Sequence, residues 1–231
     1  MGELREPSIT VAEHAGFCFG VKRAVDIVFE LLANGERIAT LGEIIHNPQI
    51  NRALAEKGVR ILDGVDRAEP GYTVVIRSHG VARSVTEAIA AKGLRCIDAT
   101  CPFVKKIHNI VSAASDAGKA VLIAGDSSHP EVEGIIGHCR GECFSFKNLS
   151  DLEFLVRSGT INPSKSSIMV AQTTFNTSEW RKCSDYIKKV CTKLEVFDTI
   201  CSATDVRQKE AAELAGRVDA MIVVGGRSSS N

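Results

Sequence analysis

Residues 95–105 read RCIDATCPFVK, an apolar stretch that runs into a single cysteine, Cys101, and directly on into a segment of helical character. The same arrangement recurs around Cys18 and around Cys201. In each copy the cysteine stands between the apolar stretch and the start of the helix. The three cysteines therefore occupy equivalent places in a repeated unit, and this internal repeat decides the fold.

The likeness between the copies continues beyond the cysteines. After Cys18, apolar residues recur at the spacing of one helix face, and a short apolar strand follows. The strands expected after the three helices are residues 37–41, 120–124 and 220–224. The first two copies add another helix and a third strand, residues 72–76 and 167–171, which have no counterpart in the third. We therefore expect an incomplete third copy, truncated by roughly fifty residues.

Strands that alternate with helices predict an α/β protein built from small modules with mostly parallel sheets. The expected modules are residues 1–94, residues 95–193 and an incomplete third module, residues 194–231. In such sheets, functional groups gather in loops at the carboxyl ends of the strands. The cysteines, three histidines and several short polar residues all follow expected strands, which predicts that they share one site.

Composition and charge narrow the function classes. The 231 residues include 28 basic and 28 acidic side chains, so the formal net charge of zero argues against nucleic-acid or polybasic membrane binding. No apolar run approaches the ~20 residues of a membrane span. Residues 1–7 have no apolar core and do not read as a signal peptide. We expect a reducing, cytoplasmic setting, where eight cysteines serve as free thiols or metal ligands.

The placement of Cys18, Cys101 and Cys201 favours metal binding. A helix start stabilises a thiolate, and Pro102 suits the first helical position after Cys101. A single such cysteine is more often a small buried apolar residue, but three equivalent ones favour joint ligation. No Cys-x-x-Cys spacing is present here, unlike in ferredoxins, so the pattern indicates an iron–sulfur cluster with one iron open to a substrate oxygen.

Polar residues at other strand ends predict an anion site. His46, His79 and His129 occupy comparable positions, and imidazoles suit a phosphate group at neutral pH. Donors on a glycine-rich turn at residues 229–231 extend the set, namely Ser229, Ser230 and Asn231. The alternative is that each histidine caps a neighbouring loop.

Glu131 is the one carboxylate placed like these histidines. In a closed cleft its pKa would rise, and it could donate a proton. Thr173 and Thr174 are positioned either to hydrogen-bond a substrate or to cap the helix expected near Thr177. Glu133 reads as an ordinary solvated glutamate.

The remaining cysteines and histidines receive structural interpretations. Cys139 and Cys143, with His138 and His129, offer a zinc site, but the spacing lacks a second matched pair. A non-catalytic zinc or thiol-redox protein is therefore the alternative class.

Seven segments, taken together, resemble the LytB/IspH family of 4-hydroxy-3-methylbut-2-enyl diphosphate reductases. They read AGFCFGV (15–21), GEIIHNP (42–48), RSHGV (77–81), DATCP (98–102), HPEVEG (129–134), QTT (172–174) and TIC (199–201). The resemblance runs in order along nearly the whole chain. It implies a trefoil of three pseudo-equivalent α/β modules around a central cleft that holds a [4Fe–4S] cluster. It also implies the last step of the non-mevalonate isoprenoid pathway, the reductive dehydroxylation of an allylic diphosphate to isopentenyl and dimethylallyl diphosphates.

The resemblance also assigns roles. Cys18, Cys101 and Cys201 would hold the cluster. The residues implied to bind the diphosphate are His46, His79, His129, Ser229, Ser230 and Asn231. Glu131 would relay protons with the help of Thr173. An electron donor such as ferredoxin or flavodoxin is the implied partner. The family's chains continue past the Ser-Ser-Asn motif with a further serine, so a fragment that binds diphosphate without turnover is a third possibility.

Overall fold

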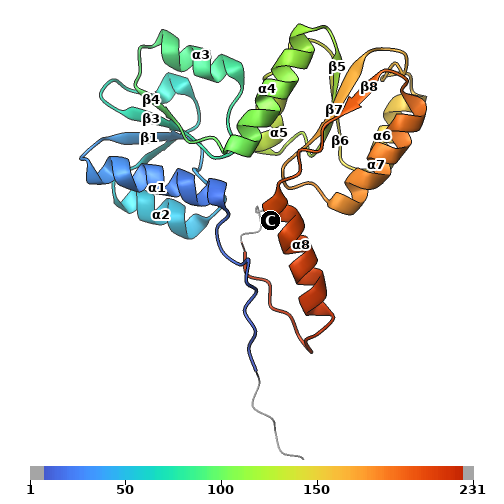
Figure 1. Cartoon of the computed structure of the whole chain (residues 1–231). Coiled ribbons are helices and arrows are strands. Elements are labelled where there is room, and N and C mark those ends of the chain that lie inside the picture. Colours follow the sequence, from blue (N-terminus) through green and yellow to red (C-terminus); the bar gives the residue numbers. More distant parts are fainter. Residues whose placement is uncertain (1–7, 226–231) are drawn as a thin grey trace, which may run out of the picture.

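The computed structural model describes residues 8–225, which form two similar α/β modules and a projecting helix (Figure 1). The first sheet has the order β2 (Arg60–Leu62), β1 (Ile38–Leu41), β3 (Thr73–Ile76), β4 (Cys96–Asp98). The second has the order β6 (Cys143–Phe146), β5 (Ala120–Ala124), β7 (Ser167–Ala171), β8 (Leu194–Val196). All neighbouring strands are parallel, and the two orders correspond strand for strand. The α/β class and the equivalence of the first two copies are thus confirmed.

Helices connect the strands, as parallel pairing requires. Those of the first module are α1 (Phe19–Ala33), α2 (Pro48–Glu56), the 3-10 turn η1 (Val65–Arg67) and α3 (Arg83–Ala91). Those of the second are α4 (Pro102–Asp116), α5 (Pro130–Ile136), α6 (Leu149–Arg157) and α7 (Thr177–Val190). The last described helix, α8 (Ser202–Ala215), lies below the two modules in Figure 1. Within residues 8–225, every helix is too short or too polar to cross a lipid bilayer.

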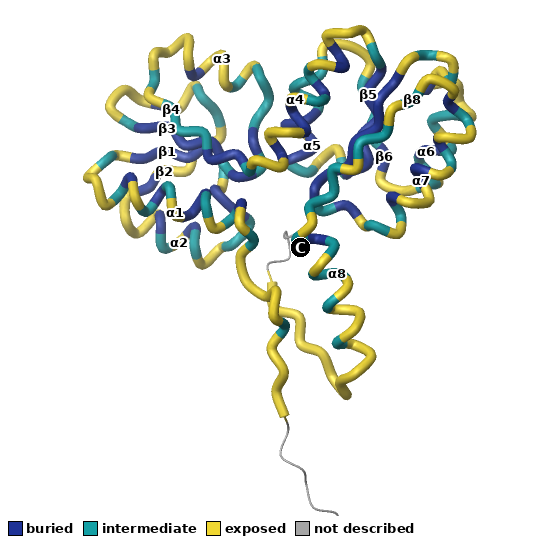
Figure 2. Tube along the Cα trace, viewed as in Figure 1, coloured by how far each residue is buried: buried dark blue, intermediate teal, exposed yellow. Residues whose placement is uncertain are grey.

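The central strands are buried from end to end, since helices cover both faces of each sheet (Figure 2). In the first module, Val28 of α1 packs with Ile38 and Val75 on one face. Ile89 of α3 packs on the other face. The second module repeats this plan with α6 and α7 on one face and α4 and α5 on the other. These cores hold the carboxyl ends of the strands rigidly.

The sheets extend further than the expected module boundaries. β4 pairs with β3, and β8 pairs with β7, so the strands that precede Cys101 and Cys201 complete the first and the second sheet respectively. Boundaries at 94/95 and 193/194 separate these strands from their own sheets. Strands β2 and β6 were not expected from the sequence. Hydrophobic periodicity detects a strand but carries no information about its partner, and β2 is mostly exposed.

The strand expected at residues 220–224 is not formed, and this prediction was wrong. Ile222, Val223 and Val224 are 88%, 84% and 90% exposed. Residues 9–12 likewise form no strand, and Ile9 is 88% exposed. A strand needs a neighbour for its backbone N–H and C=O groups. Within the described part of the chain, no further strand lies beside these segments.

Candidate active site

Cys18, Cys101 and Cys201 converge on one pocket. Each is the N-cap residue of a helix, α1, α4 and α8 respectively, and none uses its side chain to cap that helix. The sulfurs therefore remain available beside free helix N–H groups, the environment that favours a thiolate. The equivalence inferred from the repeat holds in three dimensions.

Backbone hydrogen bonds fix two of these cysteines in the same way. The amide N–H of Cys101 donates to the carbonyl of Ser78 at 2.9 Å, and that of Cys201 to the carbonyl of Thr173 at 2.8 Å. Ser78 and Thr173 each lie two residues beyond a central strand, β3 and β7. Each cysteine therefore attaches to the carboxyl end of its sheet, where the site was expected.

The surroundings of Cys101 suit a bound metal group. A Cβ atom at Gly20 would lie 2.5 Å from the Cys101 sulfur, so only glycine fits beside it. Burial raises the pKa of the Cys101 thiol, the nearby Cys18 and Cys201 raise it further, and the amides of Phe103 and Val104 oppose the rise. Three thiolates close together repel one another, and a bound metal group offsets this repulsion with its positive charge. The donor set fits an iron–sulfur cluster with three protein ligands.

His46, His79 and His129 form a ring beside the cysteine pocket, which His79 also lines. Their ring centroids lie 4.5 Å (46–79), 5.8 Å (46–129) and 5.6 Å (79–129) apart. Burial lowers the pKa of all three, and that of His79 falls to about 3. Among the described residues, Nε2 of His46 and Nδ1 of His79 are buried without a hydrogen-bond partner. A bound ligand could supply hydrogen-bond partners for these two nitrogen atoms.

Arg77 decides what kind of ligand suits this ring. The three histidines present ring nitrogens within 4.8 Å of one another, which by itself would accommodate a metal ion. However, although burial is the largest cause for all three histidines, the half-buried Arg77 guanidinium also lowers the pKa of each of them. A fixed positive charge opposes a cation and favours an anion. Sequence reasoning gave Arg77 no role, although it lies within the RSHGV segment.

Glu131 connects the cysteine pocket with the histidine ring. Its side chain is 2% exposed and lines the cysteine pocket. Its Oε1 accepts the amide N–H of Thr173 at 2.6 Å, and its Oε2 accepts the Thr173 hydroxyl at 2.7 Å. Burial raises the pKa of Glu131 despite these hydrogen bonds. Its own amide donates to Nδ1 of His129 at 3.1 Å, which places the neutral ring's proton on Nε2.

The structure separates the two roles considered for Thr173. Helix α7 is capped by Asn176, whose side chain accepts the amide of Glu179, so Thr173 does not cap it. Thr174 instead accepts a hydrogen bond from the Gln172 amide group at 2.9 Å. Thr204 also lines the pocket and donates to the Thr173 carbonyl at 3.2 Å, a contact that the sequence did not suggest. Ser229, Ser230 and Asn231 lie outside the described residues.

The zinc site considered for Cys139 and Cys143 is not assembled. Their sulfurs lie 3.1 Å apart, but His129 belongs to the histidine ring. His138 is engaged elsewhere, with Nδ1 3.4 Å from the Ser112 hydroxyl and Nε2 3.2 Å from the Val81 carbonyl. Two thiols without a further ligand do not make a structural zinc site.

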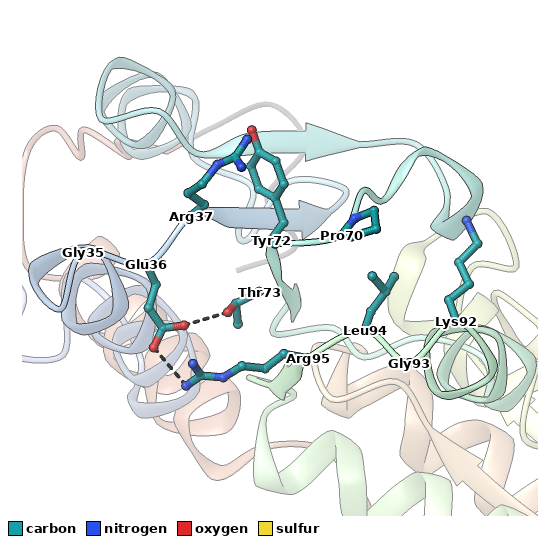
Figure 3. A pocket seen from close by; sticks show the side chains of 11 residues that line it. Gly35, Glu36, Arg37, Pro70, Tyr72, Thr73, Lys92, Gly93, Leu94 and Arg95 are labelled. Carbon is teal, nitrogen blue, oxygen red and sulfur yellow. Dashed lines mark hydrogen bonds and ion pairs between the residues drawn. The ribbon is translucent and has the colours of Figure 1, made fainter.

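A second and larger pocket, of about 550 Å³, lies at the amino ends of the first sheet's strands (Figure 3). Its cationic side chains already have partners. Arg95 pairs with Glu36 at 2.9 Å, and Arg37 stacks 4.1 Å from the Tyr72 ring centroid. Lys92 donates to the carbonyls of Val65 and Asp66. This pocket therefore does not compete with the cysteine pocket as the active site, despite its size.

The fold and the site define a class, a parallel α/β protein with three cysteines in one pocket beside a ring of three histidines. The family model described as LytB protein matches residues 9–231. The chain belongs to this family, as the sequence motifs suggested.

Named relatives agree with this assignment. The chain is 41% identical over 227 residues to a 4-hydroxy-3-methylbut-2-enyl diphosphate reductase of Caldanaerobacter subterraneus subsp. tengcongensis, covering 96% of this chain and 77% of that protein. It is 43% identical over 223 residues to the enzyme of the same name from Geotalea daltonii, again covering 96% and 77%.

Two solved structures share the fold. A structure of (E)-4-hydroxy-3-methyl-but-2-enyl diphosphate reductase, described as the terminal enzyme of the non-mevalonate pathway, matches with a TM-score of 0.74 and 40% identity, covering 96% of this chain and 78% of that one. The E-1-hydroxy-2-methyl-but-2-enyl-4-diphosphate reductase from Plasmodium falciparum matches with a TM-score of 0.86 and 28% identity, covering 94% and 68%.

Proposed function

We propose that this chain is an iron–sulfur reductase that converts 4-hydroxy-3-methylbut-2-enyl diphosphate to isopentenyl and dimethylallyl diphosphates. The overall change adds two electrons and two protons, breaks the allylic C–O bond and releases water. One observation carries the proposal: the three equivalent cysteines line the same pocket as Glu131 and His79. The LytB family membership and the names of the relatives support it.

Cys18, Cys101 and Cys201 are the residues that would hold the cluster in this proposal. When bound, a [4Fe–4S] group supplies electrons and a Lewis-acidic iron at the pocket. The helix N-termini stabilise the negative charge of the three thiolates. The neighbouring apolar side chains, Val21 and Val104 among them, exclude water from the reacting part of the substrate.

The histidine ring and Arg77 receive the diphosphate. In the absence of an anion the three imidazoles are held neutral, so they offer Nε2 or Nδ1 hydrogens without excess charge. A bound diphosphate adds negative charge that raises their pKa, so binding is coupled to proton uptake. These contacts orient the allylic end of the substrate toward the cysteines, since His79 lines both regions.

Glu131 and Thr173 move protons. Burial keeps the pKa of Glu131 raised, which favours the protonated acid needed by a donor. Protonated Glu131 can donate from Oε2 to the Thr173 oxygen while Oε1 still accepts the Thr173 amide. The Thr173 hydroxyl hydrogen is then free to donate into the pocket. The pair thus forms a two-step relay from a buried carboxyl group to the substrate.

Turnover by anaerobically reconstituted protein tests this function. With dithionite and a viologen mediator as the electron source, the chain should consume the hydroxylated diphosphate and form the two isomeric products, detected by mass spectrometry after phosphatase treatment. Binding of substrate without turnover would instead support a diphosphate-binding fragment. Absence of both binding and turnover would contradict the proposal. A ferredoxin or flavodoxin as natural donor, and a cytoplasmic location, stay predictions.

A further inference from the structure

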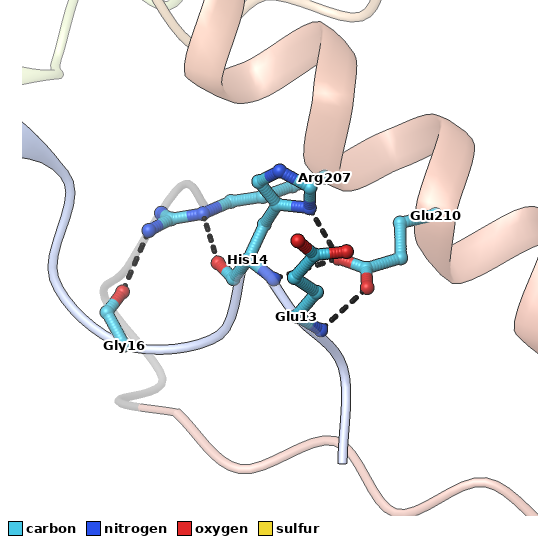
Figure 4. A network of polar contacts seen from close by, with 5 residues as sticks. All are labelled: Glu13, His14, Gly16, Arg207 and Glu210. Carbon is cyan, nitrogen blue, oxygen red and sulfur yellow. Dashed lines mark hydrogen bonds and ion pairs between the residues drawn. The ribbon is translucent and has the colours of Figure 1, made fainter. Parts of the chain in front are cut away.

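Two side chains of α8 hold the segment that leads into Cys18 (Figure 4). Glu210 accepts the amide of Glu13 at 2.6 Å and the amide of His14 at 3.0 Å, and it lies 3.1 Å from Nδ1 of His14. Arg207 donates from Nε to the His14 carbonyl at 3.0 Å and from Nη2 to the Gly16 carbonyl at 2.7 Å. We call this set of contacts the α8 clamp.

The clamp is the segment's main attachment. Residues 13–16 lie outside any helix or strand. Among residues 8–225, the hydrogen bonds that tie this segment to another element all involve Arg207 or Glu210. The two side chains are three positions apart and therefore share one face of α8. Four backbone groups of an irregular segment are thus satisfied by one helix face.

The other end of the clamp is anchored to the second module. The amide of Cys201 and the hydroxyl of Thr204 both donate to the Thr173 carbonyl, at 2.8 and 3.2 Å. Further along α8, Gln208 accepts a hydrogen bond from the Thr177 hydroxyl at 3.2 Å. These hydrogen bonds attach Cys201 and α8 to the second module. The clamp in turn attaches the segment before Cys18 to α8.

Gly16 turns the backbone between the clamp and Cys18. Its φ of +93° is a left-handed conformation that favours glycine, and it lies two residues before Cys18. Arg207 binds the carbonyl of this same residue. The clamp therefore acts on the backbone two residues before Cys18.

We propose that Arg207 and Glu210 are positioning residues, which hold Cys18 at the distance from Cys201 that a shared metal centre requires. This inference rests on the proposed function only in that the three cysteines act together. It adds two residues that touch neither the cysteine sulfurs nor the diphosphate pocket.

The test uses the metal-free full chain and the bifunctional thiol reagent dibromobimane, with linked cysteine pairs identified by peptide mass spectrometry. Glu210→Gln, Arg207→Gln and Arg207→Lys are compared with wild type. Glu213→Gln is the matched control, since it makes the same charge change one helical turn further along, at an exposed position. The Cys139–Cys143 pair, whose sulfurs lie 3.1 Å apart, is an internal standard remote from the clamp.

We expect Glu210→Gln and Arg207→Gln to lower the rate of Cys18–Cys201 linkage about tenfold, because each removes charge-assisted hydrogen bonds. Arg207→Lys should restore part of the rate, while Glu213→Gln and the internal standard stay unchanged. The thermal midpoint should change little, which separates positioning from general destabilisation.

Two results would overturn the inference in distinguishable ways. Linkage in Glu210→Gln and Arg207→Gln at the wild-type rate would show that the clamp does not position Cys18, while leaving the proposed function intact. Absence of Cys18–Cys201 linkage in wild type, with the internal standard linked normally, would contradict the shared centre itself and therefore the proposed function.

Discussion

Glu131 combines deep burial, a raised pKa and two hydrogen bonds from Thr173. Replacing it by glutamine keeps the shape and an acceptor for the Thr173 amide but removes the transferable proton. We expect Glu131→Gln to lower turnover by about 10²- to 10⁴-fold, the usual contribution of a positioned acid, with substrate affinity changed little. Steady-state kinetics and a binding isotherm measure the two quantities separately. Turnover near the wild-type rate would remove Glu131 from the relay.

Glu131→Gln should also change how the free energy of unfolding depends on pH. Because the folded-state pKa of Glu131 is raised above its ordinary value of 4.5, the native state binds the proton more tightly than the unfolded state. Stability linked to Glu131 is therefore present below pH 4.5 and is lost as the pH rises through the folded pKa. Glu131→Gln should flatten this fall in denaturant unfolding measured from pH 4 upward. Thr173→Val, which keeps the carboxyl group, is the comparison.

His79 gives the opposite pH dependence. Burial, with the nearby His46, His129 and Arg77, lowers its pKa from 6.5 to about 3. The unfolded chain takes up a proton at higher pH than the native state, so the stability linked to His79 is present above 6.5 and falls as the pH drops toward 3. His79→Gln should reduce this acid sensitivity and weaken diphosphate binding at pH 7. An unchanged acid-unfolding profile would contradict the buried, neutral state of the ring.

The sequence predicts most of the described site residues because they stand in equivalent places of a repeat. Cys18, Cys101 and Cys201 converge for that reason, as do the three histidines at the ends of comparable strands. Arg77 and Thr204 escape prediction, since their roles depend on neighbours from other segments. A basic residue beside a loop histidine has no local pattern that distinguishes it from a surface charge.

At the scale of elements, α5 sets the distance between the two modules. A Cβ atom at Gly137 would lie 2.2 Å from the Cβ and 2.7 Å from the Cα of Ala82, and the Arg83 amide donates to the Gly137 carbonyl at 3.3 Å. His129 caps the start of α5, and His79 lies three residues before Ala82. Close packing at the end of α5 therefore positions one imidazole against another.

Gly137→Ala should force this contact apart. We expect a loss of roughly 1–3 kcal/mol in unfolding free energy, typical of overpacking, together with weaker binding of inorganic diphosphate. Gly141→Ala is the matched control, because its added Cβ would have only the Ser115 hydroxyl, at 3.9 Å, within reach. Equal effects of the two substitutions would show that the α5 contact does not set the histidine spacing.

Strands were predicted well where their own apolar run is a sufficient signal. They were predicted poorly where strand formation depends on a neighbouring strand. The buried central strands β5 and β7 agree with their expected ranges, since continuous apolar runs mark strands covered on both faces. Residues 220–224 have the same kind of run but no neighbouring strand among the described residues, and they form none. Helix α8 starts at Ser202, directly after its N-cap residue Cys201.

For the whole molecule, the repeat explains why one pocket gathers residues from segments nearly two hundred positions apart. Each module presents the carboxyl end of its sheet to the pocket; Cys101 and Cys201 follow the last strand of the first and second sheet, and Cys18 precedes the first helix. The arrangement thus places thiols, imidazoles and one buried acid together without a dedicated metal-binding loop. The central claim is that these three thiols share one iron–sulfur centre.

The most direct test of that claim is the visible absorption spectrum of anaerobically reconstituted protein, with iron and sulfide content, for wild type and for Cys18→Ser, Cys101→Ser and Cys201→Ser. Cys139→Ser is the control, since it lies outside the cysteine pocket. We predict a broad brown band that dithionite bleaches, present in wild type and in the control, and strongly reduced in each of the three variants. A colourless wild type, or a band that survives all three replacements, would contradict the claim.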